Sequence, residues 1–586
     1  MDAASLLDAS ASEPASGSMD AASLLDASAS EPASEDAPVE RPREAVAATL
    51  RIAWPVFLSM CVMWLQSFVA LWLLGSAGEK LSLAAFGLAN VLCNITGHCL
   101  LWGMGAGLDT LASQAWGAKE YKAIGLYGQR ALLILTLLVN LPVVGIWWNA
   151  TPILIALHQD PAVASKVASF ARIRIAGLFC QAPVCVFVKS LTAMGKTRLQ
   201  LFPQLLQIVG SIGLLWLFIA KESPVSQHFD PVDGAATAST IIDGCAVVVY
   251  AAVMVCDAEC RRCWGGWSKQ CWAGWAGYLR IAVPAMLMCI FEWWSWDIVN
   301  FLAGLCPDPE TALATNAVLG NVVSLAYILP CGLQSGTQTL VGNALGARSP
   351  AAARVAARVG LWMGVGVMLL QAAALYLLRN AWANVFDPSQ PAVGQNVASL
   401  LRWVVFFCAA DGVHRDLDSL RTSAASTHDG GHFSQVQLIL SGVITGAGKQ
   451  KTTTPVLFSC YWLLGLPLGA AAAFHWPRNG LLGLWWGMTL AVWLHLAAYI
   501  CICFAHPCTR WAINWPAAVE AAAARLASPA ADAAESAATA TRDSDAVKLG
   551  RGSINRIATG ESSAGVTPLP ADQLAAAAES ASVVSR

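Results

Sequence analysis

The chain has 586 residues, of which 56% are hydrophobic and only 12% are charged, and its formal net charge is -2. Average globular proteins carry about 25% charged residues, so this composition excludes an ordinary soluble domain. The apolar residues come in runs of about 20 separated by short polar breaks, which is typical of a polytopic helical membrane protein. The 18 cysteines are scattered through these apolar runs and therefore predict no disulfide framework.

Both ends of the chain are polar and rich in alanine and serine. We expect residues 1–47 to form a disordered N-terminal tail and residues 507–586 to form a disordered C-terminal tail. The N-terminal tail contains a duplicated segment, because Met1–Ser16 recurs as Met19–Ser34. We assign no function to this duplication.

Between the tails we expect twelve transmembrane helices. They cover approximately residues 50–74, 83–108, 126–148, 170–194, 199–220, 236–256, 279–305, 313–341, 355–378, 395–411 continuing at 436–446, 453–474 and 481–505. Lys and Arg are about twice as frequent in one set of loops, which includes Lys119, Lys196 and Arg348, as in the other. Cytoplasmic loops carry such an excess, so we expect both termini in the cytoplasm. The protein is then a multi-pass protein of the plasma membrane or the vacuolar membrane.

The chain repeats itself at an offset of 229 residues. Leu50–Pro55 returns as Leu279–Pro284, and further along Gly103, Gly107, Thr110 and Gly117 match Gly332, Gly336, Thr339 and Gly346. Repeats with the same orientation in secondary transporters place the substrate site between the two halves. The sequence therefore predicts an all-α fold of two six-helix repeats, an N-lobe at 48–258, a cytoplasmic linker at 259–278 and a C-lobe at 279–506.

Acidic residues inside the apolar spans are the first candidates for a functional site. Glu292 and Asp297 lie in the seventh span, and Asp411 lies near the end of an apolar run in the tenth. A charge at the centre of a membrane helix costs at least about 2.5–3.5 kcal/mol, which favours a functional role over packing of a capped acid. On a helix, Glu292 and Asp297 lie about 140° apart, so we do not expect them to share one face. The repeat pairs the three acids with Met63, Phe68 and Ala182, which concentrates buried acids in the second half.

Three other charged residues in the spans are interpreted as structural or are left open. Asp109 and Asp243 lie near a polar end or a small-residue face and are interpreted as structural. Lys189 either pairs with a carboxylate or extends to the membrane surface. The linker region holds a cluster of cysteines, for which we favour reduced or palmitoylated thiols over a zinc site. These are Cys256, Cys260, Cys263 and Cys271.

Several motifs, in order and at the right spans, resemble the multidrug and toxic compound extrusion (MATE) family in its eukaryotic form. The resemblance covers about residues 48–505. It rests on Gly107–Ala118, Gly128–Arg130, Glu292–Ser295, Val341–Ala347, Leu440–Gly442 and Gly446–Gln450.

The resemblance implies two six-helix bundles around a V-shaped central cavity. It also implies antiport of organic cations or metabolites coupled to a proton gradient, with sodium as the second choice. Glu292 matches the acid of the family's E-W-W motif, Asp411 matches the acid of the tenth helix, and Asp297 matches a further acid of the seventh. Desolvation favours the neutral carboxylic acid over the charged carboxylate. A buried acidic side chain can therefore exchange a proton for a cation near neutral pH. Aromatic rings can hold an organic cation, and we expect Trp293, Trp296 and Tyr327 to line the cavity.

We expect a monomeric transporter rather than an enzyme. Its expected partners are a small-molecule substrate and the lipid bilayer, and we expect no cofactor, metal or nucleic acid. Two alternatives stay open. A flippase for lipid-linked precursors, from the same superfamily, favours a strongly cationic cavity and often has extra helices, neither of which the sequence indicates. A membrane receptor or scaffold that transports nothing does not need buried acids confined to one half.

Residues 413–435 form a polar insertion where the repeat demands the interior of a helix. Beyond it the offset rises from 229 to 253, and its removal joins Asp411-Gly412 to Val436–Gly442 in one continuous span. Every valine codon begins with GT and one glutamine codon is CAG, so the segment could be a retained intron. Our hypothesis is that the functional protein lacks it, and the alternative is a loop that splits the tenth helix. Mature transcript that carries all 23 codons and encodes a fully active transporter would contradict this hypothesis.

Overall fold

The computed structural model describes residues 41–76, 80–220, 223–306, 309–386, 434–475, 480–504 and 512–527. All regular elements within these ranges are helices. Ten of the described helical segments are long and apolar enough to cross a membrane. The expectation of an all-α polytopic protein is therefore confirmed.

The first half contains nine α-helices in its described part, before the short linker helices. They are α2 (Pro42–Ser76), α3 (Lys80–Cys93), α4 (Cys99–Gly117), α5 (Tyr121–Ile134), α6 (Leu141–Trp148), α7 (Ala150–Ala156), α8 (Pro161–Ala193), α9 (Arg198–Ile219) and α10 (Pro231–Cys256). Two π-helical turns, η1 (Asn94–His98) and η2 (Leu135–Asn140), continue α3 into α4 and α5 into α6, and a short 3-10 turn, η3 (Ser226–His228), precedes α10. Two short helices follow, α11 (Ala258–Cys263) and η4 (Lys269–Trp272).

The second half contains seven α-helices in its described part. They are α12 (Trp275–Ala303), α13 (Pro309–Gly346), α14 (Pro350–Phe386), α16 (Ser434–Ala447), α17 (Gln450–Leu457), α18 (Leu466–Phe474) and α19 (Gly480–Phe504). The π-helix η5 (Phe458–Gly465) joins α17 to α18. A further helix, which we call the C-terminal helix, covers residues 515–527.

Two of the long helices begin where an aspartate satisfies free backbone N–H groups. Asp160 caps α8 by accepting hydrogen bonds from the backbone of Ala162 and Val163, and Asp230 caps α10 in the same way. A proline follows each of these caps, at the first helical position, where its missing N–H removes no bond. Within a bilayer the backbone must then satisfy its own hydrogen bonds, which the long apolar runs do as helices.

The first helix of each half packs closely against a helix of the other half. Glycines of α4 contact α12, where an added Cβ on Gly107 would lie 2.6 Å from Ala282. Glycines of α13 contact α2 in the same way, with Gly336 against the carbonyl oxygen of Thr49. Gly107 and Gly336 are equivalent in the sequence repeat. Small residues allow such close helix approach, so the repeated glycines mark the contact between the halves.

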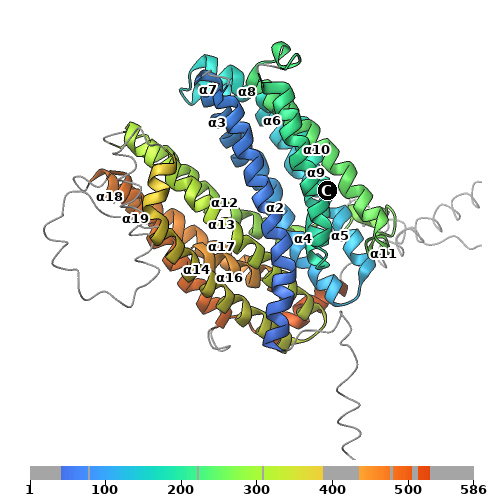
Figure 1. Cartoon of the computed structure of the whole chain (residues 1–586). Coiled ribbons are helices and arrows are strands. Elements are labelled where there is room, and N and C mark those ends of the chain that lie inside the picture. Colours follow the sequence, from blue (N-terminus) through green and yellow to red (C-terminus); the bar gives the residue numbers. More distant parts are fainter. Residues whose placement is uncertain are drawn as a thin grey trace, which may run out of the picture. The chain divides into compact units, whose positions relative to one another are not determined.

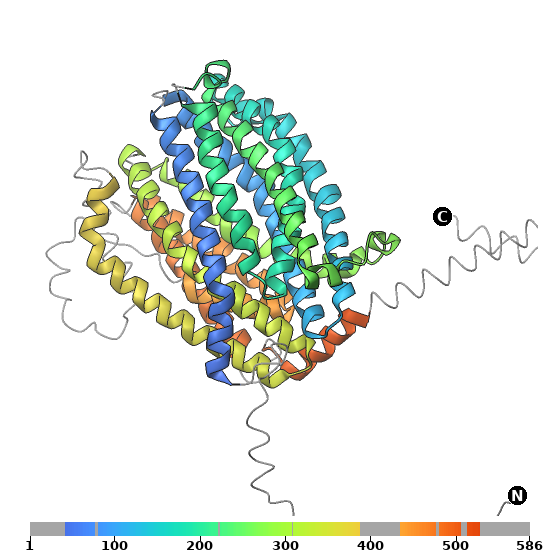
Figure 2. The same cartoon turned by 45° about the vertical axis from the view of Figure 1, so that its right-hand side comes forward.

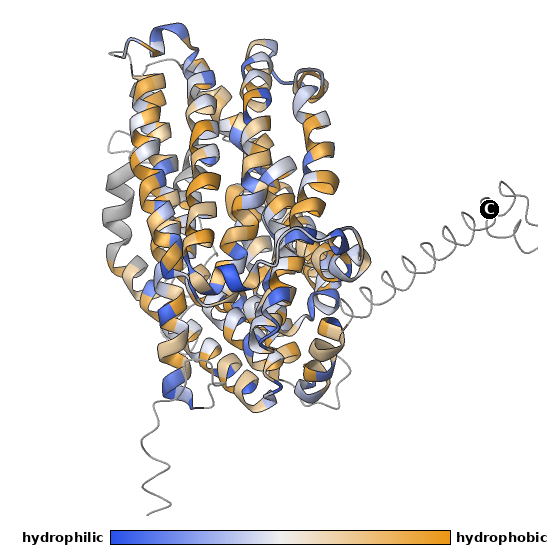
Figure 3. Cartoon of the chain, turned by 90° about the vertical axis from the view of Figure 1, so that its right-hand side faces the viewer, coloured by the Kyte–Doolittle hydropathy of each residue, from blue (hydrophilic) through white to orange (hydrophobic). Residues whose placement is uncertain are grey.

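Each half has its own buried core. One cluster draws its residues from α2 to α12 and extends from Ala70 to Ala282, and the other extends from Met288 to Ala522. Figure 1 shows that the ends of α3 and α7 lie apart from that of α18. Large apolar side chains such as Trp54, Phe202 and Leu377 are exposed, as expected for a lipid-facing surface. Figure 3 shows hydrophobic residues along most of the length of the helices.

Three boundaries differ from those expected from the sequence. The tails are not uniformly without structure, because α2 begins at Pro42 and the C-terminal helix lies within 507–586. The linker at 259–278 holds most of α11, all of η4 and the start of α12. Asp411 and nearly all of the 413–435 insertion lie outside the described residues, and α16 begins at Ser434.

Candidate functional site: a central cavity with acidic walls

Five of the six predicted site residues line one cavity of about 320 Å³. Glu292, Trp293, Trp296 and Asp297 come from α12, and Tyr327 comes from α13. Glu292 and Asp297 lie about 140° apart on α12, and both nevertheless line this cavity. Its lining residues cover about 160° of the α12 surface, which is wide enough to include both carboxylates. The sixth predicted residue, Asp411, lies outside the described part of the chain.

The rest of the cavity wall is polar and aromatic but carries no basic side chain among its described residues. It consists of Asn94, Val299, Asn300, Asn316, Gly320, Ser324 and Trp485. Asn94 is the contribution of the first half and stands at the start of the π-helical turn η1, a type of distortion frequent at functional sites. The cavity therefore combines two carboxylates with several aromatic rings.

Glu292 is held by a hydrogen-bonded chain that the sequence did not reveal. Nε2 of Gln437 on α16 donates to Oε1 of Glu292 at 3.4 Å and to the hydroxyl of Tyr461 at 3.2 Å. The Tyr461 hydroxyl lies 3.3 Å from Nδ1 of His495 on α19. Gln437, Tyr461 and His495 are all buried. No ion pair to Glu292 is present among the described residues.

Gln437 and His495 could nevertheless have been singled out from the sequence. Gln437 lies in the Val436–Gly442 run that carries part of the family resemblance, where we gave it no role. His495 is a solitary histidine within an apolar span. Their connection to Glu292 depends on three helices that are distant in sequence, so only the fold shows it.

Asp297 has a different environment. Its Oδ2 atom is buried and has no hydrogen-bond partner in the described part of the chain. A buried carboxylate oxygen without a partner is unfavourable, and a proton or a bound cation relieves that cost. Asp297 is thus suited to bind either of them.

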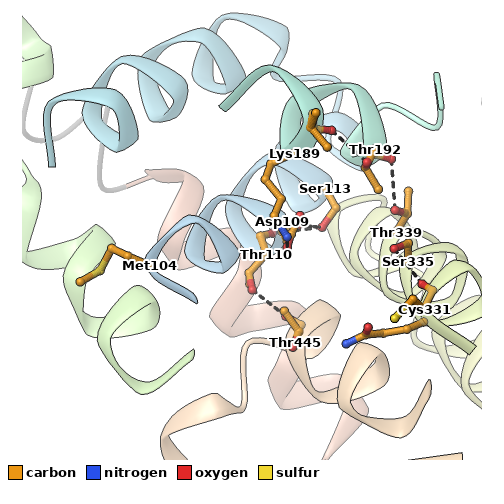
Figure 4. A network of polar contacts seen from close by, with 12 residues as sticks. Met104, Asp109, Thr110, Ser113, Lys189, Thr192, Cys331, Ser335, Thr339 and Thr445 are labelled. Atoms are coloured by element: carbon orange, nitrogen blue, oxygen red, sulfur yellow. Dashed lines mark hydrogen bonds and ion pairs between the residues drawn. The ribbon is translucent and has the colours of Figure 1, made fainter. Parts of the chain in front are cut away.

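Two acids inside the spans of the first half, Asp109 and Asp243, are paired with cations. Lys189 Nζ lies 2.5 Å from Oδ2 of Asp109, and Arg174 Nη1 lies 2.7 Å from Oδ2 of Asp243. Lys189 thus pairs with a carboxylate, which was one of its two open interpretations, and both aspartates take part in ion pairs that tie helices together. Figure 4 shows the first pair beside Thr110 and Ser113.

A pair of equivalent hydrogen bonds joins the halves at the end of the bundle where α2 begins, which we call the closed end. Thr110 donates through Oγ1 to the carbonyl oxygen of Thr445 at 2.7 Å, and Thr339 donates to that of Thr192 at 3.1 Å. Both bonds are visible in Figure 4. The donors are repeat equivalents at offset 229, and the acceptors are equivalents at offset 253. Nearby, an added Cβ on Gly117 would lie 1.9 Å from the carbonyl oxygen of Asn343.

The linker cysteines show no arrangement suited to a metal. In the described ranges, no group of three His, Cys, Asp or Glu side chains could hold a metal ion. Burial raises the pKa of Cys260 to about 12 and that of Cys263 to about 11. Both side chains therefore stay protonated thiols near neutral pH, which makes them poor nucleophiles.

Comparison with known proteins identifies the family. The family model described as MatE matches residues 55–217 and 284–428, and the two matches begin at the repeat-equivalent Pro55 and Pro284. The Arabidopsis thaliana protein DETOXIFICATION 16 is 28% identical over 450 residues, which cover 77% of this chain and 86% of that protein. The Danio rerio multidrug and toxin extrusion protein 1 is 30% identical over 469 residues, 78% and 72% of the two chains. The crystal structure of the eukaryotic MATE transporter AtDTX14 matches with a TM-score of 0.72 at 24% identity, over 83% of this chain and 99% of that one.

Proposed function

The chain belongs to the multidrug and toxic compound extrusion (MATE) family in its eukaryotic form, and we propose that it is a proton-driven antiporter that exports organic cations. The coarser statement follows from the family: this is a multi-pass membrane protein and an efflux transporter with two six-helix repeats around a V-shaped cavity. The choice of substrate charge and of coupling ion is our proposal.

The composition of the cavity carries the proposal. Its described wall holds Glu292 and Asp297, with no Lys or Arg to neutralise them, and the rings of Trp293, Trp296 and Tyr327. Carboxylates attract a cation, and aromatic rings stabilise one by about 0.5–2 kcal/mol each, depending on desolvation. The same wall disfavours the anionic substrate of a lipid-linked-precursor flippase.

Proton coupling follows from competition for the same carboxylates. Glu292 is partly buried and accepts one long hydrogen bond from Gln437, so its charged form has little stabilisation unless a cation occupies the cavity. Binding of a cationic substrate therefore favours release of the proton, and return of the proton favours release of the substrate. We assign the same exchange to Asp411 by its position in the family motif, and a supporting role to Asp297.

The orientation of the protein is also part of the proposal. The excess of Lys and Arg in one set of loops supports cytoplasmic termini, so the closed end faces the cytoplasm and the acidic cavity lies toward the opposite end. We also propose that a monomer transports, because five of the six predicted site residues line one cavity within one copy of the chain.

Uptake into proteoliposomes tests the proposal. Vesicles that contain the purified protein receive the fluorescent cation ethidium outside, under an inside-acidic pH gradient, an outward sodium gradient or no gradient. We expect accumulation driven by the pH gradient alone. Accumulation driven by sodium would overturn the coupling ion, and accumulation of an anionic dye in place of ethidium would overturn the substrate class.

A further inference from the structure

The C-terminal helix (residues 515–527) lies outside the predicted spans but is packed against both halves. Trp515, Ala518 and Ala522 are buried in the core of the second half, whereas Leu526 packs against the core of the first. The backbone N–H of Ile513 donates to the carbonyl oxygen of Ile502, which fixes the start of this segment to α19. Figure 2 shows the helix in red at the same end of the bundle as the start of α2, which is the closed end.

Arg525 places the charged end of this helix between the two halves. Its Nη1 donates to Oε1 of Gln114 on α4 at 2.9 Å, and its Nη2 donates to the carbonyl oxygen of Gly448 at 3.4 Å. The hydroxyl of Tyr127 on α5 donates to the carbonyl oxygen of Arg525 at 3.0 Å. Gln114 and Tyr127 belong to the first half and Gly448 to the second. One residue therefore bridges both halves at the closed end.

Gln114 strengthens this bridge, because its Nε2 donates to the carbonyl oxygen of Gly446 at 3.0 Å while its Oε1 accepts from Arg525. The side chain is buried, so both of its polar atoms need partners. A rotation that separates α4 from residues 446–448 breaks the bond to Gly446 and also requires the guanidinium to leave one of its two acceptors.

The repeat supplies an internal comparison for this bridge. The equivalents of Gln114, Tyr127 and Gly448 are Asn343, Ala356 and Gly195. These three residues line a cavity of about 560 Å³ at the closed end. On the other side of the repeat, Gln114, Tyr127 and Gly448 all bond to Arg525. This bridge comes from a helix outside the twelve expected spans.

We infer that Arg525 is a gating residue, which the C-terminal helix inserts between the halves to hold the closed end shut. This inference rests on the proposed function in one respect, because alternating access requires the closed end to open in each transport cycle. Opening separates the end of α4 from the turn at 446–448, so it requires release of Arg525. The helix thereby sets the population of the state that is open at this end.

Hydrogen–deuterium exchange on the full-length protein measures this population directly. The informative amides are those of residues 111–120 and 444–450, which line the contact between the halves. Arg525→Ala removes charge-assisted bonds, and we expect exchange there to accelerate about tenfold or more. Tyr127→Phe removes a single hydrogen bond and should accelerate it by about fivefold or less. Arg525→Lys keeps the charge without the planar fork and should fall between wild type and Arg525→Ala.

Glu520→Ala is the matched control, since Glu520 is exposed on the same helix, and it should exchange like wild type. Exchange in Arg525→Ala and Tyr127→Phe that equals the control would overturn the inference. If Arg525→Ala accelerates exchange throughout α8 and α10 as well, the substitution has unfolded the first half, and Tyr127→Phe then decides.

Transport kinetics provide a second measurement, which a purely structural role of Arg525 would not change. With substrate supplied at the closed end, Arg525→Ala should lower KM about tenfold with unchanged preference among organic cations, because the binding-competent state becomes more populated. A lower kcat at wild-type KM would contradict the gate. Absence of ethidium transport by the wild-type protein would overturn the proposed function and leave the exchange comparison intact.

Discussion

The two halves share one fold but treat their acidic residues in opposite ways. In the first half, Asp109 and Asp243 each contact a buried or partly buried cation at 2.5 and 2.7 Å. In the second half, Glu292 has a single long hydrogen bond from an amide, and Asp297 has an oxygen without a partner among the described residues. Paired acids join helices, whereas unpaired acids are available to a proton or a cation. The comparison separates Asp109 and Asp243, which join helices, from Glu292 and Asp297, to which we assign the exchange in our proposal.

Glu292→Gln should have the largest effect on transport. The amide cannot exchange a proton, so we expect ethidium uptake driven by a pH gradient to fall to the level of protein-free vesicles. Removal of a partly buried charge that has no cation partner among the described residues should leave the free energy of unfolding within about 1 kcal/mol of wild type. Wild-type uptake by this variant would show that Glu292 is structural and would erase the difference between the halves.

Whereas Glu292→Gln should change transport and not stability, Lys189→Ala should have a large effect on stability. It leaves Asp109 buried without its counter-ion, which should lower the free energy of unfolding by about 3–5 kcal/mol. Thermal unfolding in detergent measures the change. The double variant Lys189→Ala with Asp109→Ala should recover part of the loss, because no charge then stays uncompensated. A stable single variant with altered ion coupling would instead place Asp109 in the exchange mechanism.

Asp297→Asn should reduce transport less than Glu292→Gln does. The cavity keeps Glu292 for exchange and loses one of two negative charges, so we expect KM for ethidium to rise about fivefold, equivalent to about 1 kcal/mol of binding free energy. Initial uptake rates over a range of ethidium concentrations give KM and kcat separately. Complete loss of gradient-driven uptake would mean that the two carboxylates act as one unit.

The smallest effect is expected from Trp296→Leu. Trp296 lines the cavity, and its ring centroid lies 5.6 Å from that of Trp485 with the two rings tilted, so leucine fills much of the volume but removes the ring face. Loss of one cation–π contact should raise KM about two- to fivefold with kcat unchanged. Trp54→Leu is the control, because Trp54 is exposed on α2 and does not line the cavity. Equal effects of both substitutions would argue against stacking of the substrate on Trp296.

The sequence predicted the repeat but not its physical meaning. Periodicity and composition are local properties, so they located the helices and the charges within them. The pairing of Gly107 with Ala282, or of Thr110 with Thr445, depends on contacts between helices far apart in sequence. The glycines were visible as repeated letters, and only the packed structure shows that they lie where backbones of the two halves meet.

The C-terminal helix illustrates a signal that was present and overlooked. Trp515, Ala518, Ala522 and Leu526 recur at helical spacing and form a face, but alanine is weakly hydrophobic and the surrounding segment resembles a polar tail. Contact with both cores supplies the burial that the composition did not suggest. The chain of Gln437, Tyr461 and His495 escaped prediction for a related reason, since each lies on a different element.

The threonine bonds at the closed end also have a kinetic consequence. Thr110 bonds to Thr445 and Thr339 bonds to Thr192, and the repeat exchanges one bond with the other. An opening motion that preserves the pseudo-twofold relation between the halves lengthens both bonds at the same moment. Neither can break first to lower the barrier for the second, so their contributions to the activation energy add. Opening at this end is therefore expected to be an all-or-none event without a half-open intermediate.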